Sequence, residues 1–178
     1  MIIKIYTQPL WRVAAEILLG VLLWTVLFAT LDKQKPKLWR ILNLCILAAS
    51  VFAVVYMTML RRSAGERELI LIPGNFLQEG KQLHEIYRSF LMNILLFTPL
   101  GLTLSAVLSS KMKPWRCVWL TVLLALGFSL AVETVQYFAG LGRAEADDVL
   151  ANTFGAFIGA LHVPLASAVI NRIARRNE

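Results

Sequence analysis

The sequence predicts an all-α fold, a polytopic membrane helix bundle of about five transmembrane helices. Composition is the first observation, because 58% of the residues are hydrophobic, only 16% are charged, and the mean hydropathy is +0.66. Soluble domains average about 45–50% apolar and about 25% charged residues. The second observation is that the apolar residues gather in long runs, and the third is that the basic residues fall between these runs.

Each apolar run is long enough to form one membrane-spanning helix. We expect helices at 10–31, 39–60, 90–109, 117–139 and 149–170. The last run is the weakest, because it contains Asn152, His162 and Pro164. At a rise of about 1.5 Å per residue, a helix of about 20 residues crosses the roughly 30 Å hydrocarbon core. The connectors between the runs are short, except for residues 61–89, so we expect residues 1–178 to form a single transmembrane domain.

The long connector 61–89 contains a further apolar stretch at residues 68–75. This stretch ends in Pro73-Gly74-Asn75, and adjacent Pro and Gly residues indicate a turn. We therefore expect an element here that lies on the membrane surface or re-enters the membrane.

The basic residues of the connectors predict the orientation, because Lys and Arg are retained on the cytoplasmic side. They are concentrated in alternate connectors and in the C-terminal tail, namely Lys33, Lys35, Lys37, Arg40, Lys111, Lys113, Arg116, Arg172, Arg175 and Arg176. This places the N-terminus outside and the C-terminus inside. The net charge of +7 is thereby explained without a nucleic acid partner, since these residues do not follow one aromatic-rich face.

Polar residues within and beside the apolar runs form the candidate site. Such residues are costly in a bilayer, and they usually face a bundle interior or a cavity. Their depths agree, since they fall in the outer half of the runs or just outside it, which predicts a polar cup open to the outside. The candidate ligand-binding residues are Arg88, Asn93, Glu133, Gln136, Arg143, Asp147, Asp148 and Asn152.

Helical spacing sharpens this prediction, because residues three or four apart share a helix face. Three pairs are expected to point inward in this way: Arg12 with Glu16, Glu133 with Gln136, and Asp148 with Asn152. Gly155 and Gly159, also four apart, would give a neighbouring helix a smooth surface for close approach.

Structural roles could explain the same residues. Asp147 and Asp148 could cap the fifth helix and interact with its dipole. Asn93 could join two helices by a hydrogen bond, and Gln136 and Asn152 could act as hydrogen-bond partners. Glu133 could form an ion pair within the membrane with one of three arginines, namely Arg12, Arg88 or Arg143.

Several motifs between residues 70 and 160 occur together and in a fixed order. They are Leu71-Ile-Pro73, then Arg88 followed by Asn93-Ile-Leu-Leu-Phe97-Thr-Pro99-Leu-Gly101, then Glu133-x-x-Gln136, and finally Arg143 before Asp147-Asp148-Val-Leu-Ala-Asn152-Thr-Phe-Gly155-Ala-Phe-Ile-Gly159. In this combination the chain resembles the VanZ-like membrane proteins, a family named after a protein associated with teicoplanin resistance. The resemblance implies a multi-pass protein of the bacterial cytoplasmic membrane and a link to glycopeptide tolerance.

The leading functional hypothesis is a binding or protective protein. Its polar cup would engage the head group of an amphiphile, either a lipoglycopeptide antibiotic or a lipid-linked envelope precursor. Membrane lipids are the expected partners, a homo-oligomer is compatible with the sequence, and we expect neither a cofactor nor a resident metal.

The alternative hypothesis is a small membrane enzyme that modifies an envelope lipid. Glu133 would be the catalytic general base, and Asp147 with Asp148 would hold a divalent ion or polarise a water molecule. The sequence offers no activated Ser or Cys nucleophile, no His beside the carboxylates and no Gly-rich phosphate cradle. A transporter is disfavoured, since we find no internal repeat. An assembly subunit without a ligand stays open if the polar cluster is structural.

Overall fold

The computed structural model describes residues 9–62, 65, 67–74 and 83–176 of the chain. Within these ranges the side chains of Leu10, Lys33 and Leu83–Arg88 lie outside the description. The helices are α2 (Leu10–Gln34), α3 (Pro36–Val55) with its π-helical continuation η1 (Tyr56–Leu60), α4 (Leu83–Ser109), α5 (Pro114–Ala139), α6 (Ala146–Ala160) and α7 (His162–Arg176).

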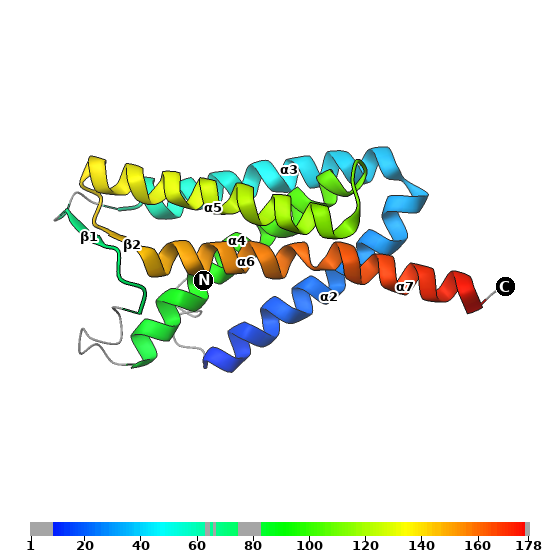
Figure 1. Cartoon of the computed structure of the whole chain (residues 1–178), viewed down its shortest axis with the longest axis horizontal. Helices are drawn as coiled ribbons and strands as arrows, with labels where there is room; N and C mark the ends of the chain where they lie inside the picture. Colours follow the sequence, from blue (N-terminus) through cyan, green and yellow to red (C-terminus); the bar gives the residue numbers. More distant parts are fainter. Residues whose placement is uncertain (1–8, 63–64, 66, 75–82, 177–178) are drawn as a thin grey trace.

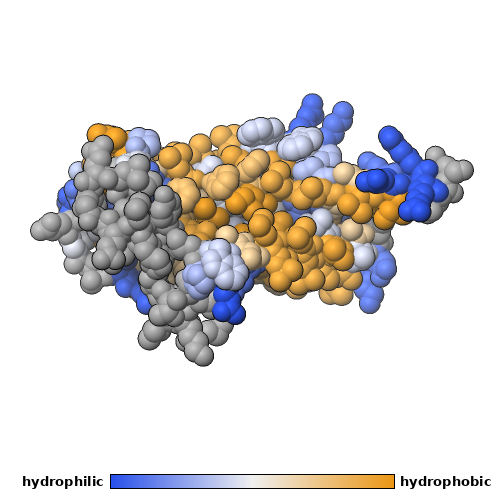
Figure 2. All heavy atoms as spheres, turned by 90° about the horizontal axis from the view of Figure 1, so that it is seen from below, coloured by the Kyte–Doolittle hydropathy of each residue, from blue (hydrophilic) through white to orange (hydrophobic). Residues whose placement is uncertain are grey.

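Five stretches of the described residues are long and apolar enough to cross a membrane, which confirms the predicted fold class. They are Trp11–Asp32, Pro36–Leu60, Ser89–Ser109, Pro114–Ala139 and Ala146–Arg176. Apolar side chains cover the middle of the molecule, and charged side chains lie mostly toward its ends (Figure 2). This distribution is the one that a lipid environment requires.

The helix ends differ from the apolar runs for identifiable reasons. α3 and α5 begin at Pro36 and Pro114 because proline is favoured in the first turn, where its missing N–H has no intrahelical partner. α4 begins at Leu83 because its first turns are polar but helix-forming, and hydropathy marks only the part inside the membrane. The fifth span consists of two helices, α6 and α7, which meet at Leu161.

The helices run back and forth along the long axis of the molecule (Figure 1). The α2–α3 and α4–α5 connectors and the C-terminus lie at one end, which we call the basic end. The α5–α6 connector and residues 68–70, which follow α3 and η1 in the chain, lie at the opposite end, which we call the strand end. The three basic regions therefore share one end, as the predicted alternation requires, while the side of the membrane that this end faces stays a prediction.

The strand end is named after a short parallel pair, β1 (Glu68–Ile70) and β2 (Arg143–Glu145). Glu68 lies opposite Arg143, and Ile70 lies opposite Glu145. The expected turn follows β1, and Gly74 adopts a φ of 82° there, which favours glycine. The strand pairing itself has no counterpart in the sequence-based prediction, because three-residue strands carry too little pattern to be recognised.

α4 lies at the centre of the packing, and its contact with α6 is the closest in the bundle core. A Cβ atom added to Gly155 would overlap the backbone of Ile94, and one added to Gly159 would overlap the backbone of Thr98. Gly101 approaches Ala156 equally closely from the α4 side. The predicted smooth surface at Gly155 and Gly159 is thus confirmed. Beside it, Phe97, Leu100 and Ala156 belong to a fully apolar cluster.

The first prediction concerns the orientation of the bundle. In a background with Cys45 and Cys117 replaced by alanine, an impermeant thiol reagent should label Leu71→Cys in intact cells. It should label Lys113→Cys only after the cells are permeabilised, because the basic end is expected in the cytoplasm. Labelling of Lys113→Cys in intact cells would invert the orientation.

The second prediction concerns the α4–α6 contact. Gly155→Leu should destabilise the protein by about 1–3 kcal/mol or more, because the new side chain forces the two backbones apart. Thermal unfolding of the detergent-purified protein and its abundance in membranes measure the effect. Gly127→Leu is the matched control, since nothing lies within 4 Å of a Cβ at Gly127. Equal melting temperatures for the two variants would contradict the proposed role of the contact.

Candidate functional site

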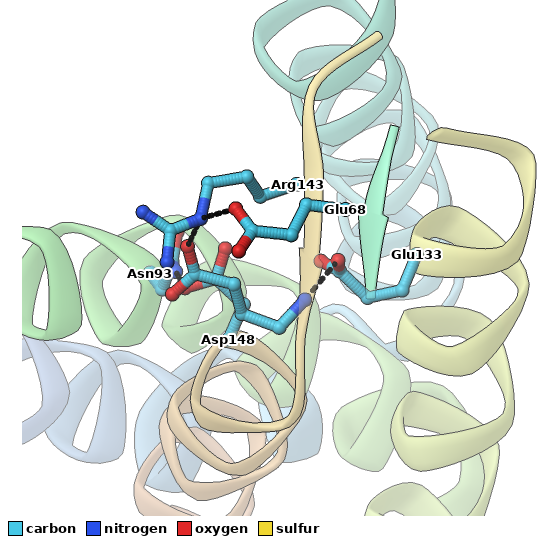
Figure 3. A network of polar contacts seen from close by, with 6 residues as sticks. Glu68, Asn93, Glu133, Arg143 and Asp148 are labelled. Atoms are coloured by element: carbon cyan, nitrogen blue, oxygen red, sulfur yellow. Dashed lines mark hydrogen bonds and ion pairs between the residues drawn. The ribbon is translucent and has the colours of Figure 1, made fainter. Parts of the chain in front are cut away.

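Four of the predicted site residues lie close together at the strand end, where α4, α5, α6 and β2 meet, namely Asn93, Glu133, Arg143 and Asp148 (Figure 3). Arg88 belongs to α4, but its side chain lies outside the described part of the chain. The other seven residues occupy three kinds of position. Some tie the strands to the helices, some join helices inside the bundle, and two line hollows in the surface.

Arg143 ties the two strands together. Its Nε lies 2.9 Å from a carboxylate oxygen of Glu68 and 3.3 Å from one of Glu145 (Figure 3). Asp147 adds a second tie, because its Oδ1 accepts a hydrogen bond of 2.8 Å from the backbone N–H of Gly74. We call these five residues the strand clasp, and they fasten residues 68–74 to the start of α6.

Glu133 projects from α5 toward β2 and is only 7% exposed. Its Oε2 accepts a hydrogen bond of 3.1 Å from the backbone N–H of Glu145, and the carboxylate lies on the side of β2 opposite the Arg143 guanidinium (Figure 3). The positive charge of Arg62 and the negative charge of Asp148 also act on it. Glu133 is therefore a buried carboxylate fixed by a backbone donor and placed among charges of both signs.

The expectation that Arg12 and Glu16 point inward is wrong. The two side chains lie 4.0 Å apart, and each is 59% exposed on the surface of α2. The inward face of α2 is instead formed by Val13 and Ile17, because the apolar residues of this helix pack against α4 and α6.

Gln136 and Asn152 join helices within the bundle. Gln136 is fully buried, and its Nε2 donates to the carbonyl oxygen of Thr58 in η1 at 2.8 Å. Asn152 Nδ2 donates to the hydroxyl of Ser129 on α5 at 2.9 Å. Among the described residues, the amide oxygens of both side chains have no hydrogen-bond donor. Both pairs have the interhelical geometry that the structural alternative predicts.

Asp147 and Asp148 lie in the first turn of α6, where carboxylates interact favourably with the helix dipole. The prediction that they cap the helix is wrong, since the N-cap residue is Glu145. Consecutive helical residues point about 100° apart. Asp147 therefore reaches Gly74, whereas Asp148 reaches α4, where its Oδ1 accepts a hydrogen bond of 2.7 Å from Asn93 Nδ2. In the described ranges no three His, Cys, Asp or Glu side chains are grouped as a metal site would require.

A cavity of about 800 Å³ lies between α3 with η1 on one side and α4 on the other. We call it the α3–α4 groove. Polar residues line the part nearest the strand end, namely Thr58, Arg62, Ser89 and Asn93. Apolar residues line most of the rest, among them Ile46, Ala49, Ala53, Leu95, Leu96 and Pro99. The groove is thus polar at one end and apolar along its length.

Arg62 and the groove are absent from the sequence-based prediction. Arg62 follows the second apolar run directly, where an arginine is read as a topology signal. Ala49 and Ala53, four residues apart on α3, resemble a helix-packing stripe. The groove could have been recognised from the pair Ala49 and Ala53 together with a basic residue, Arg62, at the depth of Asn93.

A second hollow of about 470 Å³ lies between α5, α6 and the two strands. We call it the α5–α6 pocket. Its wall is mostly apolar, with Leu69, Leu130 and Tyr137 among the lining residues, and it includes the carboxylate-bearing Glu133 and Glu145. Glu133 therefore borders open space in this second hollow, and it is not among the residues that line the α3–α4 groove.

The sequence model of the family described as VanZ/LLP1 matches residues 17–167. The match extends beyond the motifs at 70–160 on both sides and includes every described helix at least in part. Neither a curated protein nor a solved structure matches the chain. Since the family match covers most of a chain with five apolar spans, this multi-pass membrane protein belongs to the VanZ/LLP1 family.

Proposed function

We propose that the chain binds an amphiphile from within the membrane. The head group would lie at the polar end of the α3–α4 groove, and the hydrocarbon would lie along the apolar remainder. The observation that carries this proposal is the single cavity that joins Arg62 and Asn93 to a wall of alanine, leucine and proline side chains. Such a gradient matches a molecule that is polar at one end only.

The dimensions of the groove support this occupant. Ile46 and Arg62 are both lining residues, and the intervening helix is roughly 24 Å long, most of the roughly 30 Å hydrocarbon core. Ala49 and Ala53 leave space where larger side chains would fill the groove. Pro99 lacks an N–H, so the carbonyl of Leu95 has no standard helical donor beside the groove. A membrane lipid could therefore enter from the side with little rearrangement.

The structure of η1 also favours a binding role for this region. A π-helical turn is rare, and such turns occur frequently at functional sites. Here the turn covers Tyr56–Leu60, with Thr58 on the groove wall and its carbonyl held by Gln136. The buried amide thus supports the backbone that shapes the polar end.

In this proposal the predicted site residues have different roles. Asn93 would contact the head group, and Arg88, which directly precedes Ser89 on α4, stays a predicted contact. Arg143 and Asp147 would position the strand clasp above the groove. Gln136, Asp148 and Asn152 would hold the helices that form its walls, and Glu133 would contribute charge beside Arg62.

The chemical identity of the amphiphile follows from the family resemblance and the predicted orientation. With the strand end outside the bacterial cytoplasmic membrane, the polar end would face lipoglycopeptides such as teicoplanin and lipid-linked envelope precursors. Binding either molecule would connect the chain to glycopeptide tolerance. Membrane lipids would occupy the groove otherwise, and a second copy of the chain is not required.

A second candidate function is catalysis at the α5–α6 pocket. The observation that favours it is Glu133, a buried carboxylate that lines an open and mostly apolar pocket, where a general base could meet a lipid substrate. Asp147 and Asp148 support it less, because they have separate partners and would have to rotate to share an ion.

The third prediction tests the groove. Ala49→Phe should reduce the lipid that copurifies with the protein, and any teicoplanin tolerance it confers, by about tenfold, because the ring would occupy space needed by one hydrocarbon chain. Mass spectrometry of extracted lipid and growth assays in a sensitive host measure the two effects. Ala48→Phe is the matched control, since Ala48 is exposed but does not line the groove. The proposal fails if both variants behave like the wild type, or if both lose abundance.

The fourth prediction separates binding from catalysis. Glu133→Gln keeps an oxygen that can accept from Glu145 N–H but removes the negative charge. We expect severalfold weaker lipid binding, with no product formed by either the variant or the wild type. Chromatography of a lipid-linked precursor incubated with purified protein measures turnover, and Glu16→Gln on the exposed face of α2 is the control. Time-dependent conversion by the wild type that is lost in Glu133→Gln would establish the catalytic function instead.

A further inference from the structure

We propose that the head group bound in the α3–α4 groove carries a phosphate, and that Arg62 is the residue that binds it. This inference rests on the proposed function and narrows it to one class of ligand, a phosphate-bearing lipid.

Arg62 is one of the residues that line the polar end of the groove. Arg62 follows η1 by two residues, and Ser89 and Asn93 line the same end from α4. A guanidinium presents several N–H donors in a planar fork that matches two oxygens of a phosphate, and the Ser89 hydroxyl is a further donor. The polar end is therefore rich in donors.

Two described carboxylates on which the charge of Arg62 acts accept hydrogen bonds from other donors. Glu133 accepts from Glu145 N–H, and Asp148 accepts from Asn93. In the described ranges no carboxylate lies within ion-pair distance of the guanidinium. Neither Glu133 nor Asp148 takes a hydrogen bond from Arg62, so within the described part of the chain the guanidinium fork is available to an anion.

Gly142 lies beside the guanidinium, and its backbone conformation favours glycine. A Cβ at Gly142 would lie 3.5 Å from Nη1 of Arg62, and the φ of 115° at this residue already disfavours other side chains. The α5–α6 connector thus passes close to Arg62 without covering it with a side chain at this point.

The depth of Arg62 matches the level of lipid phosphates. The second apolar span ends at Leu60, so Arg62 lies at the boundary between hydrocarbon and head groups. Lipid phosphates occupy this level, and basic pockets between transmembrane helices are a known way to bind them. A hydrocarbon chain running down the groove from Ala53 to Ile46 would place its own phosphate near Arg62.

The test uses dioleoyl phosphatidate and dioleoylglycerol, which have the same chains and differ in the phosphate. Equilibrium binding of each lipid to the detergent-purified protein should favour the phosphatidate by about tenfold or more in the wild type. Arg62→Gln should remove this preference, whereas Arg62→Lys should keep part of it, because an ammonium retains the charge but not the planar fork.

Arg61→Gln is the matched control. Arg61 is exposed, its Nη1 contacts Met57 Sδ, and it does not line the groove, so the preference should change by less than about twofold. An equal loss in Arg61→Gln would identify a general surface-charge effect and overturn the inference. An unchanged preference in Arg62→Gln would overturn it as well.

The same measurements separate failure of the inference from failure of the proposed function. If the wild type binds both lipids equally and Ala49→Phe abolishes both, the groove binds amphiphiles but does not recognise phosphate. If the wild type binds neither lipid, the groove is not an amphiphile site and both proposals fail. Monodisperse elution and an unchanged melting temperature identify variants that are folded.

Discussion

The backbone contact between α4 and α6 is the constraint on which the rest of the structure depends. In a membrane the hydrophobic effect does not drive helices together, so close packing of small residues has to do so. Gly101, Gly155 and Gly159 bring the two backbones so near that no side chain fits between them. The hydrogen bond between Asn93 and Asp148 at the strand end depends directly on the spacing and register that this contact sets.

Several polar contacts at the strand end are related to the register of α4 and α6. With α4 and α6 fixed, Asn93 faces Asp148 across the helix pair. The neighbouring carboxylate of Asp147 points away from α4 and accepts a hydrogen bond from the backbone N–H of Gly74. Arg143 joins the two strands through its ion pair with Glu68. Each of these bonds joins segments far apart in the chain, so a shift between the helices would disrupt several of them at once.

The two hollows have different lining residues and differ in charge. The α3–α4 groove has Arg62 at its polar end, whereas the α5–α6 pocket has Glu133 and Glu145 in its wall. The positive charge of Arg62 acts on Glu133, although the two residues line different hollows.

The sequence by itself determined the membrane class, the five spans and the depth of the polar residues, because hydropathy and charge act residue by residue along the chain. It also indicated the packing role of Gly155 and Gly159, since a four-residue spacing defines one helix face. Only the tertiary structure decided the partners of those residues. The strand pairing, the outward position of Arg12 and Glu16, and the joining of Arg62 to the groove all depend on how helices turn against one another. The rotation of each helix is set by contacts between segments that are distant in the sequence. A local sequence pattern therefore does not predict it.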